Sequence, residues 1–523
     1  MNNFTSALRY LTSVDTYAPL MPAGANTKVQ RAAIPLHFTQ QLVDAGHFEP
    51  VDKKDVRGSV FVFAVPEHAK QRFRIIQHPK LVNERLAPAP AVAFRSIRDR
   101  CQMVHAGSSA GAVDLSAYYT QFELAPDVRN FFCALLPSSS APASNPRWDL
   151  HRLRVGPTGQ SHMVHVACAT TALLKDFEHH SAVHDDQIDN VLFVGDPVHV
   201  ARDLEIFSNR CTAVGVTINE DMSVPSALVG SSLNWCGLAL DFNKKTVSLT
   251  AKVVDKTRLS WSNRERWTWR GFAAHVGLLF YAMQVITVPV ASFFNLLRFV
   301  SQVGHAMQAA NDLKWDEPAA VWDCAWTDLS EWTSLALCNA PRLVPKHAEA
   351  DVFVLVDSSA DGWGYVALDL LTGKIFSHGE RWSPDFVLEH GINKLRRSVF
   401  TEPHGILKMK CHLTAQLTGR RSFRVGTDNV AAKATLTRGF ASRSYDMNNV
   451  AAVDRKNFAD HQWEYWHVNG RVNIYADLLS RGGKLAREDL LGVSESLRRL
   501  LGDNNPAATS GGGGQAEVLP HTQ

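Results

Sequence analysis

Arrangements of cysteine that build metal sites or disulfide frameworks are missing from this sequence. The eight cysteines are scattered along 523 residues, and no two of them form a Cys-x-x-Cys pair. That pattern argues against a zinc module and a disulfide scaffold, and it fits a reducing compartment. The first residues, Met1 to Phe4, also lack the basic segment and apolar core of a secretory signal. We therefore expect an intracellular protein, in the cytoplasm, the nucleus or both.

A strong excess of charge of one sign is missing as well. Lys and Arg number 54 against 51 Asp and Glu, which gives a net charge of +3. The whole chain therefore does not attract polyanions, and a nucleic acid would have to bind at a local basic surface. The apolar content of 45% is that of an ordinary globular protein. At ~150 residues per domain, the length allows roughly three or four domains.

An uninterrupted apolar run long enough for a membrane span is also absent. The closest candidate, residues 271–297, contains His275, Gln284, Pro289 and Asn295. A membrane-spanning helix needs about 20 predominantly apolar residues. Because proline ends or kinks a helix, two buried helices broken near Pro289 are the better interpretation.

Acidic side chains stand at the ends of predicted strands in the C-terminal part. An apolar run ends at Asp357, a second strand leads to Asp428, and Asp477 follows later, with Glu402 between the first two. A single Asp at a strand end is usually a turn residue or a helix cap. Three in this order, together with the Glu, favour metal-dependent phosphodiester cleavage.

A second set of acidic residues lies in the N-terminal half. Asp114 follows an apolar segment, and Asp189 with Asn190 can form a tight turn before the apolar strand 191–194. An Asp at a hairpin tip is normally structural, and it becomes of interest only if Asp114 lies beside it. Two such carboxylates can hold two Mg²⁺ ions about 4 Å apart for in-line phosphoryl transfer.

Cationic and glycine-rich segments flank that acidic pair. Strands at 59–65 and 72–76 predict a hairpin in which Arg72 and Arg74 share one face. Arginine is suited to bidentate phosphate contacts, although a solvated edge strand is the alternative. The turn 156–159, Gly-Pro-Thr-Gly, precedes an apolar helix at 162–174. Glycine allows close backbone approach there, but such a turn is usually only a turn.

The remaining chain gives a coarse secondary structure. Its patterns predict a helix at 37–45, a helix at 198–208, a segment at 211–218 leading to a strand, a hairpin of 233–241 with 246–249, helices within 257–310, and a connection at 311–350. The glycine-rich tail from Gly502 cannot bury a core and is expected to be disordered.

The order of these segments resembles the reverse transcriptase and ribonuclease H region of LTR-type and tyrosine-recombinase (DIRS-type) retroelements, above all the VIPER-like branch. The resemblance covers about residues 58–485. It implies an α+β and α/β multidomain fold: a right-hand polymerase with fingers, palm and thumb, followed by a ribonuclease H-like mixed-sheet domain. The implied parts are an N-terminal extension (1–57), fingers and palm (58–256), a thumb-like helical segment (257–310), a connection (311–350), a ribonuclease H-like domain (351–485), and a C-terminal helix with a disordered tail (486–523).

The resemblance also implies roles for residues of the polymerase part. Asp114 and Asp189 would be the catalytic, metal-binding carboxylates. The implied nucleotide-binding residues are Arg72 and Arg74 at the triphosphate, Tyr119 at the sugar, and Thr158 and Gly159 in the turn against template and nucleotide. The chain departs from the family pattern at Gln187 in place of Tyr, at Asn190 in place of a second Asp, and at Met222 near a usual Lys.

In the C-terminal part the resemblance implies four catalytic, metal-binding carboxylates: Asp357, Glu402, Asp428 and Asp477. Glu389 is the alternative to Glu402, whose helix must hold Pro403 in its first turn. Two Mg²⁺ ions per site are implied, with Mn²⁺ as a substitute. Candidate backbone contacts to nucleic acid are Lys394, Arg396, Arg397, Arg420, Arg421 and Arg424.

The implied function is that of an RNA-directed DNA polymerase with ribonuclease H activity. Its partners would be an RNA template, a DNA primer, an RNA–DNA hybrid and dNTPs, with no membrane. One alternative is a decayed or domesticated copy that binds nucleic acid without polymerase activity. Another is a stand-alone nuclease with a structural N-terminal half.

Overall fold

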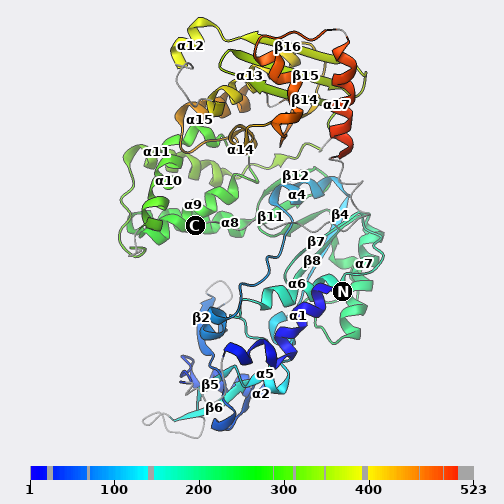
Figure 1. The fold of residues 1–523 in the computed structure, drawn as a ribbon. Helices are drawn as coiled ribbons and strands as arrows, with labels where there is room; N and C mark the ends of the chain where they lie inside the picture. Colours follow the sequence, from blue (N-terminus) through cyan, green and yellow to red (C-terminus); the bar gives the residue numbers. More distant parts are fainter. Residues whose placement is uncertain are drawn as a thin grey trace. The chain divides into compact units, whose positions relative to one another are not determined.

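The computed structural model describes residues 2–20, 28–67, 71–138, 147–286, 288–309, 314–346, 349–390, 398–458, 460–486 and 488–503. The chain divides into two compact units, Met1–Thr250 with Pro341–Val344, and Ala251–Ala340 with Pro345–Gln523. Figure 1 labels the elements of both units. The predicted disordered tail beyond residue 503 and the predicted contacts Lys394, Arg396 and Arg397 lie outside the described residues.

The first unit begins with helices and two small β structures. The helices α1 (Asn2–Thr12) and α2 (Leu36–Asp44) precede an antiparallel sheet of order β1-β6-β5 (Phe48–Pro50, Trp148–Leu153, Cys133–Pro137). The hairpin of β2 (Phe61–Glu67) and β3 (Arg72–His78) is the one that the alternating sequence pattern predicts. Val62 on the buried side of this hairpin belongs to the same apolar core as Leu42 and Phe132.

A four-stranded antiparallel sheet follows, of order β7-β8-β4-β9 (Val183–Gln187, Asn190–Gly195, Ser109–Asp114, Val229–Gly230). The helices α6 (Met163–Leu174) and α7 (Pro197–Ala213) pack on it through Ala167, Leu204 and Phe207, against Val191 and Phe193. A tight hairpin turn joins β7 and β8, but it lies one residue earlier than predicted: Ile188 and Asp189 form the turn, and Asn190 is the first residue of β8, paired with Gln187. This sheet therefore brings the end of β4 beside that turn.

Two predictions for the rest of this unit are wrong in detail. The segment 211–218 leads to no strand: α7 continues to Ala213, and Ile218 forms only an isolated bridge with Leu115. The predicted strand 233–241 is broken at Cys236 and Gly237, whose φ angles are +47° and +86°. It becomes β10 (Ser232–Trp235) and β11 (Leu238–Asp241), which pair with each other. The predicted hairpin with β12 (Thr246–Leu249) is present through β11, and β13 (Arg342–Leu343) completes the sheet. A left-handed turn at these residues folds the strand back on itself.

The second unit starts with helices α8 (Ala251–Ser262), α9 (Trp269–Ala282), α10 (Phe294–Ala309) and α11 (Asp323–Cys338). The predicted break near Pro289 separates α9 from α10. The expected connection at 311–350 contains the 16-residue helix α11, because Trp332 is fully buried there and stacks on Phe293. Among the described residues, no helix is long and apolar enough to cross a membrane.

A five-stranded mixed sheet completes the second unit, in the order β16-β15-β14-β17-β18 (Ile375–Arg381, Gly362–Asp369, Val352–Ser358, Ser422–Thr427, Gln462–His467). The strands β14, β15 and β16 pair antiparallel, whereas β14, β17 and β18 run parallel. Because successive side chains of a strand face opposite sides, β14 contributes to two cores.

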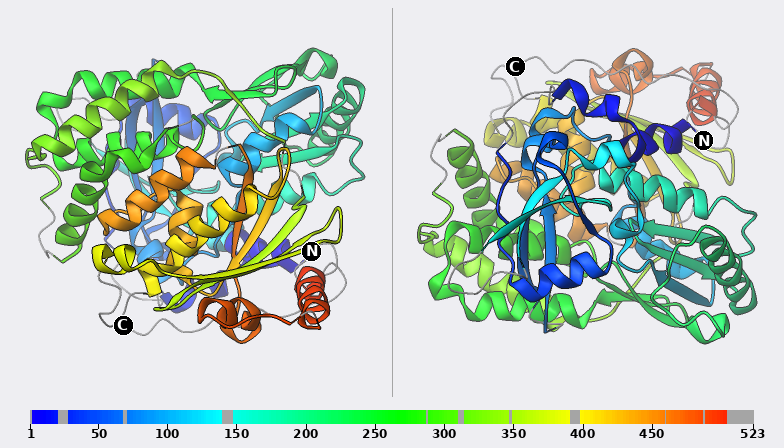
Figure 2. Two further views of the ribbon diagram at one scale, coloured as in Figure 1. Left: turned by 90° about the horizontal axis from the view of Figure 1, so that it is seen from above. Right: turned by 90° about the horizontal axis from the view of Figure 1, so that it is seen from below.

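One core lies under α13 (Ser398–Thr414), α14 (Val430–Arg438) and α15 (Tyr445–Asn457), and it includes Val354. The other lies under α16 (Ile474–Ser480) and α17 (Asp489–Asp503), and it includes Leu355. Figures 1 and 2 show these two sets of helices on opposite faces of the sheet. Every residue of β14 is buried, so its C-terminal end is held firmly in place.

Candidate active sites

Three acidic side chains converge at one edge of the mixed sheet. Asp357 lies near the end of β14, Asp428 directly follows β17, and Glu402 projects from α13. Each offers a carboxylate oxygen, and these oxygens lie within 4.8 Å of one another. Since β14 and β17 are parallel neighbours, their C-terminal ends meet at the same edge, as the strand-end positions predicted.

Glu402 is the most deeply enclosed member of this acidic cluster. Its carboxylate accepts hydrogen bonds from the backbone N of Ser358 (3.2 Å) and from Thr427 Oγ1 (3.4 Å). Burial, with the charges of Asp357 and Asp428 added, raises the pKa of Glu402 to about 9. The cluster therefore holds a proton at neutral pH until a cation neutralises the repulsion.

Asp357 experiences the same burial and repulsion, with two compensating contacts. Burial raises its pKa, the Ser480 hydroxyl lowers it through a hydrogen bond, and the charges of Asp428 and Asp477 raise it further, opposed by Arg481. Ser480 Oγ donates to Asp357 Oδ2 at 2.6 Å. The contact fixes the orientation of the carboxylate.

Asp477, the fourth predicted carboxylate, lies outside the group of three. It belongs to α16, and its Oδ1 pairs with Arg481 Nε (2.9 Å) and Nη2 (2.8 Å). The start of α16 is tied to β14 because Asn473 Nδ2 donates to the Val356 carbonyl (3.0 Å). The charge of Asp477 contributes to raising the pKa of Asp357. The Asp477 carboxylate is itself paired with Arg481.

The residues of this cluster fit a hydrated divalent cation. Their donors are carboxylate oxygens, which Mg²⁺ and Mn²⁺ prefer. Two buried oxygens of neighbouring residues, Ser358 Oγ and Asn473 Oδ1, have no hydrogen-bond partner among the described residues. The donor set of the cluster is consistent with the metal site expected from the sequence.

The helix that carries Glu402 differs from expectation in one respect. Pro403 lies inside α13 and not in its first turn, so the helix proceeds with one backbone hydrogen bond fewer. The alternative Glu389 belongs to α12 (Pro384–His390), and it is not part of the cluster. Glu402 is therefore the glutamate that the fold brings to Asp357.

In the first unit, the predicted pair Asp114 and Asp189 meets across the β4–β8 ladder. Asp114 is directly opposite Asn190, and Leu115 N donates to the Asp189 carbonyl at 2.8 Å. Asp114 Oδ2 accepts from Asn219 Nδ2 (2.7 Å), and Asp189 Oδ1 accepts from Asn190 Nδ2 (2.8 Å). The strand end and the hairpin tip are thus adjacent.

A third acid near Asp114 escaped the sequence analysis. Glu220 Oε2 accepts from the backbone N of Asp114 at 2.8 Å. Its carboxylate nevertheless does not complete a metal-binding group there, because the cluster of Asp357, Glu402 and Asp428 is the one group of three that the described part of the chain contains. Its position next to Asn219 in the sequence gave no sign of this contact.

The hairpin tip is held in an uncommon conformation. Ile188 has a φ of +61°, which is rare for a β-branched residue and marks local strain. Its carbonyl accepts from Thr171 Oγ1 at 2.7 Å. Burial and then the charge of Asp189 raise the pKa of Tyr119, five residues after Asp114, to about 12. Its contact with a sugar stays a prediction.

A buried ion pair fixes the strand before the tip, and the sequence did not reveal it. Arg100 Nε pairs with Asp185 (2.7 Å), and both side chains are almost fully buried. Arg100 Nη2 also donates to Gln187 Oε1 (2.9 Å), and Trp235 Nε1 donates to Asp185 (2.7 Å). Gln187 therefore has a structural partner here.

The predicted nucleotide-binding arginines both pair with one carboxylate. Arg72 Nε lies 2.7 Å and Arg74 Nη2 lies 2.9 Å from Glu67. Both side chains are more than half exposed. A polyphosphate would have to compete with Glu67 for them.

The turn with Thr158 and Gly159 packs on β3 of the same hairpin. Gly159 N donates to the Gln77 carbonyl (2.9 Å), and Thr158 Oγ1 donates to Gln77 Oε1 (2.9 Å). A Cβ at Gly159 would come within 2.7 Å of that carbonyl, so the close approach requires glycine.

Two other predicted residues have structural partners. Arg421 pairs with Asp351 (3.0 Å) and Asp369 (2.6 Å), and Arg424 pairs with Glu464 (3.1 Å). Arg421 therefore links the residue before β14, Asp351, to the last residue of β15, Asp369. Arg420 is exposed, and Met222 packs on the core of the β4 sheet.

Comparisons with known proteins give no family. No known protein family matches the sequence, and no curated protein matches it. The fold is similar to solved structures of a foamy viral protease-reverse transcriptase. The form named dRH, bound to double-stranded DNA, is 12% identical with a TM-score of 0.47, covering 84% of this chain and 70% of that one.

Two further structures of that foamy viral protein are similar at the same level. The complex with double-stranded DNA is 13% identical (TM-score 0.44; 85% of each chain), and the complex with an RNA/DNA hybrid is 11% identical (TM-score 0.45; 85% of this chain and 56% of that one). At TM-scores below 0.5 these likenesses decide nothing, and the function has to be inferred from the site itself.

Proposed function

We propose that this chain is an RNA-directed DNA polymerase with ribonuclease H activity, which copies RNA into DNA and cleaves the RNA of the resulting hybrid. The observation that carries the proposal is the convergence of Asp357, Glu402 and Asp428 at the edge of the mixed sheet. Two of these acids, Asp357 and Glu402, are buried, whereas Asp428 is not. Buried acids that repel a neighbouring acid are retained at a cost in stability, which is typical of sites that bind cations. We further propose that it acts inside the cell and derives from a DIRS-type, VIPER-like retroelement.

In the nuclease site, each residue has a distinct task. Asp357 and Asp428 would hold the cations from the edge of the sheet, and Ser480 orients Asp357 through its hydrogen bond. Glu402 would join them as an ionised ligand, since a cation offsets the burial and repulsion that raise its pKa. Two Mg²⁺ ions, or Mn²⁺ in their place, would supply activation of a water and stabilisation of the leaving oxygen.

In the polymerase site, Asp114 and Asp189 would bind two such divalent cations beside a primer 3′-hydroxyl. Arg72 and Arg74 would exchange Glu67 for the triphosphate of the incoming dNTP, since a phosphate matches their fork geometry. Tyr119 would contact the sugar. An RNA template, a DNA primer and the hybrid are the remaining partners.

A second candidate function is nucleic-acid binding without synthesis, as in a decayed or domesticated copy. Asn190 favours it, because its amide occupies one oxygen of Asp189 and contributes no charge of its own. Fewer carboxylates weaken the hold on two cations.

Two assays on the full chain separate these functions. One measures extension of a DNA primer on an RNA template in Mg²⁺, and the other measures cleavage of an RNA–DNA hybrid. The proposal predicts that Asp114→Asn abolishes extension and spares cleavage, and that Asp357→Asn does the opposite. Hybrid cleavage without extension in the wild type contradicts the polymerase assignment, and binding with neither activity favours the decayed copy.

A further inference from the structure

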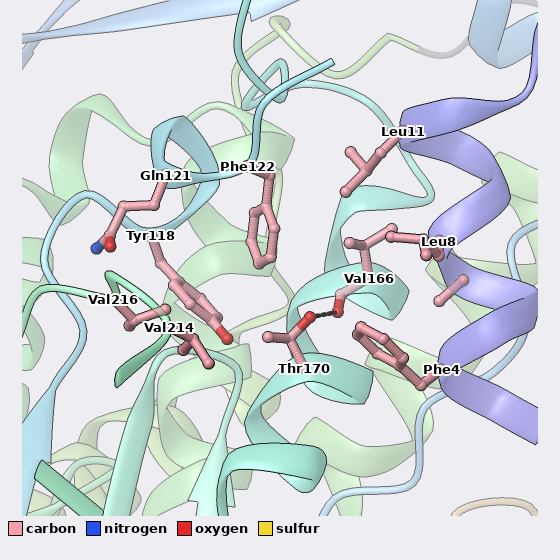
Figure 3. Close-up of a pocket in the computed structure, with 11 residues that line it drawn as sticks. Phe4, Leu8, Leu11, Tyr118, Gln121, Phe122, Val166, Thr170, Val214 and Val216 are labelled. Atoms are coloured by element: carbon pink, nitrogen blue, oxygen red, sulfur yellow. Dashed lines mark hydrogen bonds between the residues drawn. The ribbon is translucent and has the colours of Figure 1, made fainter. Parts of the chain in front are cut away.

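An apolar pocket of about 210 Å³ lies beside the polymerase residues of the first unit. Its walls come from α1, α6, the short helix η6 (Tyr118–Gln121) and the residues that follow α7. Figure 3 shows the side chains that face it, among them Phe4, Leu8, Tyr118, Phe122, Val214 and Val216.

The polar side chains of this pocket are already paired within the protein. Thr170 Oγ1 donates to the Val166 carbonyl at 3.0 Å, the bond drawn in Figure 3. The Tyr118 hydroxyl accepts from Thr171 (3.3 Å), and Gln121 Oε1 accepts from Thr217 N (2.8 Å). A water in the pocket would find few partners, although the pocket is not sealed from solvent, since Val214 in its wall is 63% exposed.

We propose that this pocket binds a small apolar molecule of one or two aromatic rings, and that occupancy is transmitted to the nucleotide site. The size and the apolar wall argue for this class, because an apolar cavity of about 150 Å³ accepts benzene in another protein. The wall supports it too, since no lining side chain requires a polar partner. A peptide helix or a charged ligand would not fit such a space.

The link to the nucleotide site runs through η6, and it rests on the proposed polymerase function. Tyr118 faces the pocket, and Thr171 Oγ1 contacts both its hydroxyl (3.3 Å) and the carbonyl of Ile188 (2.7 Å), the residue before Asp189. Gln121 also lines the pocket, and its side chain donates to the Ser116 and Thr217 carbonyls. Ser116 follows Asp114 by two positions, so a molecule against η6 presses on residues that flank both acids.

The binding half of the proposal is tested with toluene as the probe and the full chain as the receptor. Val214→Trp fills the pocket from a side chain that is 63% exposed, so the fold should tolerate it. Val198→Trp is the matched control, because Val198 is 72% exposed near the start of α7 and does not line the pocket.

We expect toluene to raise the thermal unfolding temperature of the wild type and of Val198→Trp in a saturable manner. Toluene should bind Val214→Trp at least tenfold more weakly. No saturable rise in the wild type, or an equal rise in Val214→Trp, overturns the binding site.

The coupling is tested by single-nucleotide incorporation. Saturating toluene should change the KM for the incoming dNTP at least threefold in the wild type and in Val198→Trp, with no change in Val214→Trp. Binding without a KM change overturns the coupling. If no protein incorporates nucleotide at all, the proposed polymerase function has failed and the coupling falls with it, while the unfolding data still decide whether the pocket binds.

Discussion

Ser480 Oγ donates a 2.6 Å hydrogen bond to Asp357 Oδ2, although the two residues are 123 positions apart in the chain. The contact fastens the end of α16 to the end of β14. Both side chains are buried, so the carboxylate has no freedom to rotate away from the cluster. The hydrogen bond also lowers the pKa of Asp357, against the raising effect of burial.

Replacing Ser480 should therefore weaken the site without unfolding the protein. We predict that Ser480→Ala raises the Mg²⁺ concentration needed for half-maximal hybrid cleavage about 10-fold or more, as loss of a partner that orients a ligand does. The measurement is a Mg²⁺ titration of cleavage. Ser334→Ala, which removes only an intrahelical hydroxyl contact on α11, is the control and should leave the titration unchanged. An unchanged titration in Ser480→Ala would show that the hydrogen bond does not position Asp357.

The raised pKa of Glu402 predicts a pH dependence of stability in metal-free protein. Its pKa of about 9 when folded exceeds the ordinary value of 4.5, so the folded state retains a proton between these pH values. The free energy of unfolding should fall as pH rises through this window, with a slope of up to about 1.4 kcal/mol per pH unit. Urea unfolding in EDTA at several pH values measures it.

Two comparisons decide whether Glu402 is the source of that slope. Glu402→Gln should flatten it, because the amide does not titrate. Excess Mg²⁺ should flatten it as well, because the ionised carboxylate is then stabilised. A slope that persists in Glu402→Gln assigns the pH dependence to other groups.

The shared contact of Arg72 and Arg74 with Glu67 predicts competition with the nucleotide. Glu67→Gln should lower the KM for dNTP several-fold, because the arginines no longer have an ionic partner to give up. Arg74→Ala should raise it. Steady-state incorporation provides both values, and Lys54→Ala, an exposed cation outside the hairpin, serves as the control. A higher KM in Glu67→Gln would mean that Glu67 supports the arginines more than it competes.

Asn190 provides a gain-of-function prediction. Asn190→Asp adds a carboxylate opposite Asp114 and removes the amide that occupies Asp189 Oδ1, so Mg²⁺-dependent extension should rise several-fold. The double variant with Asp114→Asn should be inactive. If Asn190→Asp extends primers no faster than the wild type, the missing second acid is not what limits this site.

Local patterns were sufficient to predict much of the fold. The apolar segments 59–65 and 72–76 predicted the β2–β3 hairpin, and Pro289 marked the break between α9 and α10. Both signals depend only on neighbours in the chain. The strand-end acids pointed to the cluster because parallel strands end at one edge, and three of the four converge. Their catalytic role stays a prediction.

The sequence did not predict contacts between residues that are far apart in the chain. Arg100 and Asp185 look like ordinary surface charges in the sequence, yet they form a buried pair 85 positions apart. Nothing in the sequence indicates that Ser480 reaches Asp357. The turn at Cys236 and Gly237 was hidden because both flanking segments read as one apolar strand. Such features depend on tertiary packing, which overrides local preference.

The most direct test of the central claim is to locate the cations. A crystal of the chain grown with Mn²⁺ should show anomalous scattering at the cluster, with metal in bonding contact with carboxylate oxygens of Asp357 and Asp428, and crystals of Asp357→Asn should lack it. Absence of metal there in the wild type, in crystals saturated with Mn²⁺, would contradict the claim that these acids form a nuclease site.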